Sequence, residues 1–436
     1  MKTSEIFEGL LGNLVIDNNE TIAARRDEIT KVLNQEFRGL DSSSKNQLMV
    51  GSYGRYTAIR GISDLDLLFV LPASLWDTYT GEDGPRDALT RARNAIQKRY
   101  PNTSVKVDRL VVVVTFQNFM FEVQPVFEQD DGSFKYPDTQ SKSWKTTKPR
   151  EEIKETSDYN SITNGNFRRL CKMARAWKNK HGVAMGGLLL DTLAYNFLQK
   201  NTDHHSATAA TYDLLVRDFF SFLSEEEDHD HYQALGSKQD VKVKKKFQRK
   251  AKTAYELCLK AIDAEGKTTV NAKWKKVFGK PIPTADTTSK AASASTFDDT
   301  EEFIEDELPV DVRYSLAIDC TVSQQGFRTH FLRDMLSKRF PLLPRKKLDF
   351  TITECTVPEP FTVRWKVLNR GHEAERRNLL RGQIISPNRH NNGRYEGTNF
   401  RGDHYVECYA IKSGVVVARD HIDVPISTDQ PSIKSD

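Results

Sequence analysis

The chain has 436 residues, which is enough for two or three domains at about 150 residues each. Charged residues make up 28% of it, yet the formal net charge is only +4, so a protein that coats nucleic acid or follows a template strand is not expected. The N-terminus lacks the apolar core of a signal peptide, and no apolar run approaches a membrane span. The five cysteines are far apart, without a CxxC pair. We therefore expect a soluble cytoplasmic protein with reduced thiols and no membrane partner.

The first part of the chain, residues 1–160, has the pattern of a sheet flanked by helices. Apolar side chains recur at helical spacing in some segments, and strand-forming apolar runs occupy others. The expected elements are helices within residues 4–37 and 84–99, and strands within residues 46–72, 105–116 and 119–127. We predict one α+β domain here, with its own N-terminal helix.

The rest of the chain changes pattern twice. Residues 161–282 are predicted to form a helical lobe, because four segments show a spacing near 3.6 with a polar opposite face. Residues 283–308 are rich in small and acidic side chains and are predicted to be a linker. Residues 309–436 alternate or run apolar between Gly, Pro and Asn turns, which predicts a β-rich third domain. The expected helices are 167–180, 188–199, 212–223 and 242–261, and the expected strands are 314–322, 348–356, 361–368, 404–411 and 415–424.

The run from Gly51 to Val70 carries the clearest chemical signal. Asp64 and Asp66 are two positions apart on an apolar strand, so their side chains face the same side. Two carboxylates this close repel each other, and a bound divalent cation with a preference for hard oxygen ligands, such as Mg²⁺, removes that penalty. The Gly51-Ser52 turn offers backbone N–H groups and a hydroxyl to phosphate oxygens. This combination predicts chemistry at a nucleotide phosphate.

A third carboxylate is expected at Glu122. This residue lies between Phe121 and Val123 on an apolar strand, so it faces the side opposite to theirs. A buried acidic side chain is costly unless it is paired or bound to a metal. Asp108 is the alternative, but its flanking Lys106 and Arg109 favour a surface ion pair there.

These residues resemble the polymerase-β-like nucleotidyltransferases, and most closely their bacterial cGAS/DncV-like branch, the CD-NTases. The run GSYGRYTAIRGISDLDLLFVLP and the segment Glu122-Val123-Gln124-Pro125 carry the likeness. The helix from Arg168 to Lys178 and the run Leu190–Ala194 extend it into the helical region. After residue 309, the chain resembles the adenylyl/guanylyl and SMODS C-terminal sensor domain, in the segments 365–374, 380–384 and 401–408.

The resemblance implies an enzyme that makes cyclic oligonucleotide second messengers from NTPs. Asp64 and Asp66 would hold two Mg²⁺ ions, and Glu122 would join them at the ion that activates a ribose hydroxyl. That hydroxyl attacks an α-phosphate and releases pyrophosphate, while Gly51 and Ser52 hold the β- and γ-phosphates. The product would act on a downstream effector, in antiphage defence. Alternatives are a synthase of linear oligonucleotides or terminal additions, and a degenerate core that only regulates by binding nucleotides.

Further residues are expected to bind substrate or regulate the enzyme. Arg168, Lys172, Arg175 and Lys178 lie three or four positions apart, so they share a helix face that could neutralise the triphosphate. Candidates for stacking on a base are Tyr53, Tyr56 and Tyr195. By family analogy, the C-terminal domain binds an activating ligand. The polar residues proposed for that pocket are Arg381, Glu396, Arg401, His404 and Glu407.

Overall fold

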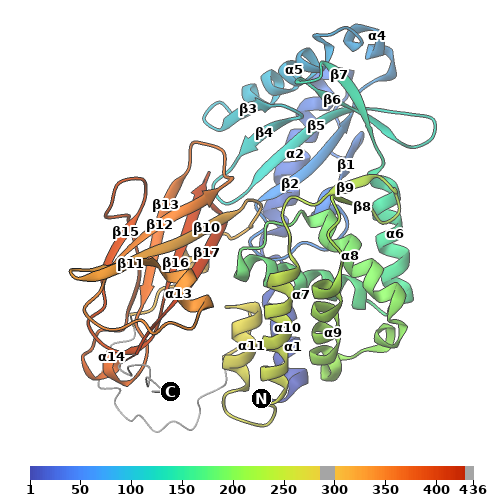
Figure 1. Cartoon of the computed structure of the whole chain (residues 1–436). Coiled ribbons are helices and arrows are strands. Elements are labelled where there is room, and N and C mark those ends of the chain that lie inside the picture. The colour runs from blue at the N-terminus through green and yellow to red at the C-terminus, as the bar shows by residue number, and fades with distance from the viewer. Residues whose placement is uncertain (285–299, 428–436) are drawn as a thin grey trace. The chain divides into compact units, whose positions relative to one another are not determined.

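The computed structural model describes residues 1–284 and 300–427, which form two compact units (Figure 1). The first unit comprises Met1–Lys180 and Met185–Thr284. The second unit takes in the short segment His181–Ala184 together with the described C-terminal residues. Within the described ranges, no helix combines the length and the apolar character needed to cross a membrane.

A mixed seven-stranded sheet forms the centre of the first unit. Its order is β1-β2-β5-β4-β3, with β6 paired to β5 and β7 paired to β6. The central strands β2 (Asp64–Val70) and β5 (Met120–Glu128) run parallel, whereas all the other pairs are antiparallel. The remaining strands are β1 (Gln47–Met49), β3 (Ser104–Asp108), β4 (Val111–Thr115), β6 (Phe134–Asp138) and β7 (Ser143–Thr147).

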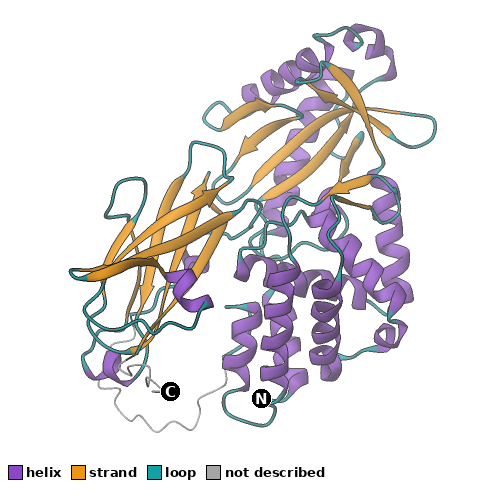
Figure 2. Ribbon diagram, viewed as in Figure 1, coloured by secondary structure: helices purple, strands orange, loops and turns teal. Residues whose placement is uncertain are grey.

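One face of this sheet is covered by α2 (Asn19–Arg38) and α5 (Gly84–Arg99) (Figure 2). Alternate residues of the two central strands, such as Leu65, Leu67 and Phe121, are buried in the core between the sheet and these helices. Because side chains alternate along a strand, the residues between them face the opposite side of the sheet. The short helices α3 (Gly51–Gly54) and α4 (Trp76–Tyr79) follow β1 and β2.

The remainder of the first unit is mainly helical. It contains α6 (Pro149–Ile162), α7 (Asn166–His181), α8 (Gly187–Lys200), α9 (Tyr212–Glu225), α10 (Gln248–Ile262) and α11 (Val270–Phe278), with a small hairpin of β8 (His231–Gln233) and β9 (Asp240–Lys242). The N-terminal helix α1 (Thr3–Asn13) packs here rather than on the sheet, since Phe7 contacts Tyr212, Trp274 and Phe278 edge-on.

Two four-stranded antiparallel sheets form a sandwich in the second unit (Figure 2). One has the order β11-β10-β12-β15 and the other the order β14-β13-β16-β17. Trp365, Phe350 and Val406 lie in the core between them. The strands are β10 (Leu316–Gln324), β11 (Phe327–Phe331), β12 (Lys347–Cys355), β13 (Thr362–Leu368), β14 (Arg381–Ile385), β15 (Arg394–Gly397), β16 (Gly402–Lys412) and β17 (Val415–Ile426), and the short helices are α12 (Ile304–Glu307), α13 (Leu332–Ser337) and α14 (His372–Arg376).

The α+β fold class is as predicted, but several element boundaries are not. The strand expected over 105–116 is a hairpin, because Arg109 and Leu110 turn the chain between β3 and β4. The helix expected over 242–261 begins only at Gln248. The sequence pattern does not predict α6 or the β6–β7 hairpin, because both are polar enough to resemble loops.

The described end of the expected linker is part of the C-terminal unit. Ile304 is fully buried against Val416 and Tyr409, and Glu305 accepts a hydrogen bond from Arg419 at 2.7 Å. Residues 300–308 were expected to be part of a solvated linker. This prediction is corrected, because acidic residues of this segment form ion pairs with the C-terminal sheet. The earlier linker residues 285–299 lie outside the described part of the chain.

Candidate active site

The turn before α3 lies directly against β2. The Val50 N–H donates to the Asp66 carbonyl at 2.9 Å, which ties the turn to the strand. Gly51 has φ +61°, and a Cβ added to it would lie 1.8 Å from Oδ2 of Asp66. Glycine is therefore required at position 51 for two reasons: its left-handed backbone conformation, and the space that the Asp66 carboxylate occupies. The structure thus brings the predicted Gly51-Ser52 turn and the predicted carboxylate into contact.

The three predicted carboxylates share one face of the sheet. Asp64 and Asp66 are half-buried and alternate with the buried Leu65 and Leu67. Glu122 is also half-buried, and it is the register partner of Asp66 on the neighbouring parallel strand β5. Adjacent strands lie about 4.8 Å apart, so side chains at partnered positions are close neighbours. All three side chains therefore emerge on the side of the sheet away from α2 and α5.

This donor set fits Mg²⁺ by chemistry and by strand placement. Three carboxylates supply the hard oxygen ligands that Mg²⁺ prefers. Within residues 1–284 and 300–427, no three His, Cys, Asp or Glu side chains are already gathered as a ready metal site. The strand register nevertheless places Glu122 beside Asp66, and Gly51 makes room for the carboxylate of Asp66. Asp64, Asp66 and Glu122 would hold the ions.

Behind the turn lies a buried ionic network that sequence reasoning missed. Asp191 of α8 is fully buried and accepts hydrogen bonds from Arg175 at 2.5 and 3.0 Å, from Arg55 at 3.0 Å and from the Thr57 hydroxyl at 2.9 Å. Arg55 also reaches Glu152 of α6 at 3.2 Å. Since Arg55 directly follows α3, the network fixes the end of the turn to α6, α7 and α8.

Burial and the arginines act in opposite directions on the two acids of this network. Burial alone would raise the pKa of Asp191, but Arg175 and Arg55 together hold that pKa below its ordinary value. For Glu152, burial prevails over the attraction of Arg55, and its pKa is raised. Asp191 is thus a structural anion paired with two cations. The signal that could have found it is an acid inside the apolar run Leu190–Ala194.

The four basic residues of α7 do not form one continuous exposed surface. Arg175 and Lys178 are buried, and the guanidinium of Arg175 is bound to Asp191, so its predicted place at the triphosphate is corrected to the buried network. Arg168 and Lys172 are half-buried. The pKa of Lys172 is lowered, first by burial and then by the neighbouring Arg168 and Arg175. The helix face was predicted correctly from spacing, but spacing does not show what covers the face.

Of the three tyrosines expected to stack on a base, Tyr56 has the most suitable position. It is 67% exposed, directly follows Arg55 and has the Arg168 guanidinium 5.0 Å from its ring centroid. Tyr195 is instead buried, with its ring 4.5 Å from that of Tyr159 and its hydroxyl bonded to a glutamate. The Tyr53 hydroxyl donates to the Asn19 side chain at 3.1 Å. Tyr195 is therefore a core residue rather than a stacking platform.

The polar residues predicted for a C-terminal pocket separate into two groups. Arg381, Glu396 and His404 line one cavity at the end of the sandwich. Glu407 is buried and accepts a hydrogen bond from Arg419 at 2.8 Å, so it belongs to an internal ion pair. Arg401 is exposed and is not among the residues that line the cavity. The pocket prediction is thus corrected for Arg401 and Glu407.

The central sheet, with the turn against β2, is the fold of a nucleotidyltransferase. Residues 1–160 match the Second Messenger Oligonucleotide or Dinucleotide Synthetase (SMODS) domain. Residues 298–427 match the Adenylyl/Guanylyl and SMODS C-terminal sensor domain. Residues 1–160 therefore belong to the SMODS domain family, and residues 298–427 belong to the family of its C-terminal sensor domains.

Curated relatives agree with this family. The chain is 27% identical over 139 residues to a cyclic AMP-AMP-AMP synthase of Acinetobacter sp., a match that covers 30% of this chain and 38% of that enzyme. It is 22% identical over 283 residues to a probable cyclic nucleotide synthase of Bacillus cereus, which covers 55% and 83% of the two chains.

A solved structure shows the same fold. The Vibrio cholerae DncV cyclic AMP-GMP synthase in complex with nonhydrolyzable GTP aligns with a TM-score of 0.51 and 13% identity, over 63% of this chain and 93% of that chain. At this identity the likeness establishes the fold of the shared part.

Proposed function

We propose that this protein condenses nucleoside triphosphates into a cyclic oligonucleotide second messenger. The observation that carries the proposal is the contact between the Gly51-Ser52 turn and Asp66, next to Glu122 on the adjacent strand. A phosphate-binding turn in contact with a face of carboxylates is the arrangement that nucleotidyl transfer needs. The domain families and the synthases among the relatives support the same reaction.

In the proposed reaction, a ribose hydroxyl of one nucleotide attacks the α-phosphate of another, and pyrophosphate leaves. Asp64, Asp66 and Glu122 would hold two Mg²⁺ ions, which when bound stabilise the entering and leaving oxygens together. The Ser52 hydroxyl and the backbone of Gly51 and Ser52 bind the β- and γ-phosphates. A second transfer within the linear product closes the ring.

Two cations and one aromatic ring are assigned to substrate binding around this centre. The Arg168 Nε–H donates to the carbonyl of Arg55 at 3.1 Å, which holds Arg168 at the end of the phosphate-binding turn. We assign Arg168 and Lys172 to the triphosphate charge and the exposed ring of Tyr56 to the base. Arg175 does not contact the substrate in this proposal. It holds Asp191, and Asp191 in turn holds Arg55 at the end of the turn.

The test uses the purified full-length chain with Mg²⁺ and four labelled NTPs. The expected result is pyrophosphate release and a product that resists phosphatase and exonuclease. The double variant Asp64→Asn, Asp66→Asn should make none, whereas Asp108→Asn, which removes an exposed carboxylate of β3 in the same sheet, should retain activity. Product from the double variant would overturn the proposal. A product that phosphatase and exonuclease degrade would identify a linear or terminal transferase instead.

The physiological role that we infer is antiphage defence through an effector that binds the product. The sensor domain supports control of the synthase by an activating ligand. Phage plaque counts on cells that carry the wild-type chain or the Asp64→Asn, Asp66→Asn variant test this role. Equal plaque counts on both would contradict it.

A further inference from the structure

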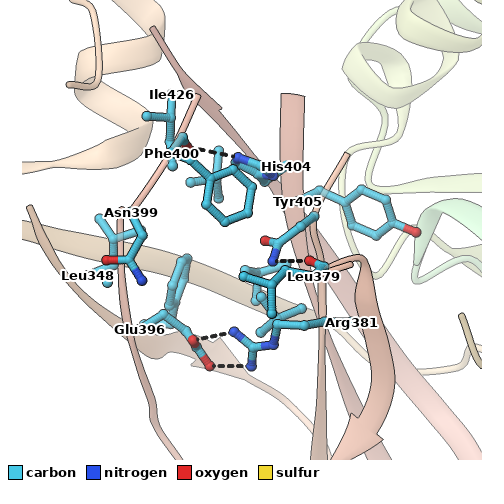
Figure 3. A pocket seen from close by; sticks show the side chains of 15 residues that line it. Leu348, Leu379, Arg381, Glu396, Asn399, Phe400, His404, Tyr405 and Ile426 are labelled. Carbon is cyan, nitrogen blue, oxygen red and sulfur yellow. Dashed lines mark hydrogen bonds and ion pairs between the residues drawn. The ribbon is translucent and has the colours of Figure 1, made fainter. Parts of the chain in front are cut away.

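A cavity of about 260 Å³ opens at one end of the C-terminal sandwich (Figure 3). Its floor is apolar and comes from both sheets, with Leu348 and Phe350 on β12, Val367 on β13, Val406 on β16 and Val424 on β17. Sites for drug-sized ligands measure roughly 300–1,000 Å³. This cavity therefore suits a smaller molecule with an apolar body, such as a single flat ring system.

The charges of the side chains that line this cavity are already compensated. Of the described residues that line it, Arg381 is the one cation that is permanently charged, and it makes a two-pronged ion pair with Glu396 at 2.6 and 3.0 Å (Figure 3). His404 accepts a hydrogen bond at Nδ1 from the Arg370 N–H and is within 3.3 Å of the Phe400 carbonyl at Nε2, which is the pattern of a neutral ring. Burial also lowers the pKa of His404, which favours the neutral form of the ring. The site therefore favours a neutral ligand over an anion.

The mouth of the cavity offers hydrogen bonds to such a ligand. The side chain of Asn399 lines it, and within the described residues no hydrogen bond occupies that amide. Asn369 donates through its NH₂ group to the Leu379 carbonyl at 2.8 Å, which leaves its Oδ1 as an acceptor. An amide presents a donor and an acceptor side by side, which matches the edge of a nucleobase, and Phe400 supplies an aromatic ring at the cavity.

Backbone strain at the same place supports a binding role. Arg381 has φ +60°, a left-handed conformation that is uncommon for a residue other than glycine, and Gly382 follows with φ +97°. The pairing of β13 with β14 also shifts register between Lys366 and Leu368. Bulges and strained residues redirect side chains and gather at functional sites. Here they accompany the ion pair that closes one side of the cavity.

We propose that this cavity binds a neutral heterocycle of nucleobase size, with its ring on the apolar floor and its polar edge at Asn399 and Asn369. The site is separate from the proposed catalytic residues, all of which lie in the first unit. It gives the sensor domain a defined ligand chemistry. The cavity has no uncompensated cation for a phosphate group among its lining residues.

Calorimetry on the full-length chain in EDTA tests the proposal, with adenine, hypoxanthine, cytosine and uracil as probes. At least one base should bind at one site per chain. Asn399→Ala should weaken that base about five- to tenfold, the effect of one neutral hydrogen bond. Val424→Phe, which fills the floor, should abolish binding. The control Asn102→Ala changes an exposed amide in the first unit and should leave binding unchanged.

Because Val424→Phe overpacks a core, circular dichroism is used to check that this variant folds. If it is unfolded, the binding measurement on Asn399→Ala tests the proposal, since Asn399 is exposed and its replacement should not disturb the fold. The 5′-monophosphate of the best base should bind no more than about twofold more tightly than the base, since the lining arginine is already paired. The proposal is overturned if none of the four bases saturates a site, if binding survives Asn399→Ala unchanged, or if the monophosphate binds tenfold more tightly.

Discussion

Two groups of acidic side chains lie near the two ends of the same short helix α3, one beside Gly51 and the other bound by Arg55, and their environments differ. Asp64, Asp66 and Glu122 are half-buried on an open face of the sheet, with the Gly51 turn against one of them. Asp191 is fully buried, and two arginines and a threonine hydroxyl bind it. Buried acids that are bound by arginine support the fold, whereas half-buried carboxylates beside a phosphate-binding turn are placed to bind a metal ion. The comparison predicts that stability depends on one cluster and activity on the other.

The largest expected effect is on activity, at the open cluster. Asp66→Asn should lower the rate of nucleotide condensation on the order of 10³-fold, because a metal site supplies several kcal/mol of transition-state stabilisation. The midpoint of thermal unfolding should change little, because Asp66 is only half-buried. Initial rates with saturating NTPs and a thermal melt measure both. A destabilised Asp66→Asn protein would mean that the two clusters are not distinct.

The next effect is on stability, at the buried cluster. Asp191→Asn leaves Arg55 and Arg175 buried without their shared anion and should lower the free energy of unfolding by about 3–5 kcal/mol. Urea denaturation measures the change. Asp203→Asn, at an exposed aspartate of the same unit, should stay close to wild type. If both variants unfold at the same urea concentration, Asp191 is not the structural anion described here.

A third variant tests the contact between the turn and the open cluster. Gly51→Ala places a Cβ against Oδ2 of Asp66 and imposes a left-handed conformation on alanine. A displacement of about 1 Å at a reacting centre can lower a rate about 10²-fold, and we expect a loss of that size. Gly12→Ala is the matched control, because a Cβ there has no neighbour within 4 Å. Equal rates for both variants would show that the turn does not position the carboxylate.

The smallest effect is a pH dependence within the buried cluster. Because the folded pKa of Glu152 is raised, its protonated form contributes stability that is fully present below the unfolded pKa and is lost as the pH rises through the folded pKa. Asp191, whose pKa is lowered, contributes stability above its unfolded pKa of about 3.9 and loses it in stronger acid. Glu152→Gln should therefore gain stability relative to wild type as the pH rises above about 4.5. Urea midpoints of both proteins from pH 4 to pH 7 measure this, and parallel curves would refute it.

The sequence was sufficient to predict which face of its strand each of the three carboxylates takes, because alternation along a strand is local. Alternation along one strand places Asp64 and Asp66 on one face, and an acid between Phe121 and Val123 marks Glu122. The same signal, an acid within an apolar run, is present at Asp191. An isolated acid shows that a partner is needed, but not which partner.

The buried cluster and the cavity depend on contacts between distant segments, which spacing does not reveal. Arg175 shares a helix face with Arg168 and Lys172, yet its partner comes from α8 and its other neighbours from the core. In the sandwich, strand register decides that Glu407 faces Arg419 while His404 faces the cavity. Strand register and helix packing arise from the whole fold. Residue types alone therefore predict candidate binding residues, but they do not separate those that line a site from those that form internal ion pairs.

We propose that Asp64, Asp66 and Glu122 close around magnesium beside a bound triphosphate. A crystal structure of the wild-type chain with Mg²⁺ and a non-hydrolysable NTP tests it most directly. We expect cation density among these three carboxylates and the β- and γ-phosphates against Gly51 and Ser52. Carboxylates that stay apart with no cation among them, or a triphosphate bound elsewhere, would contradict it.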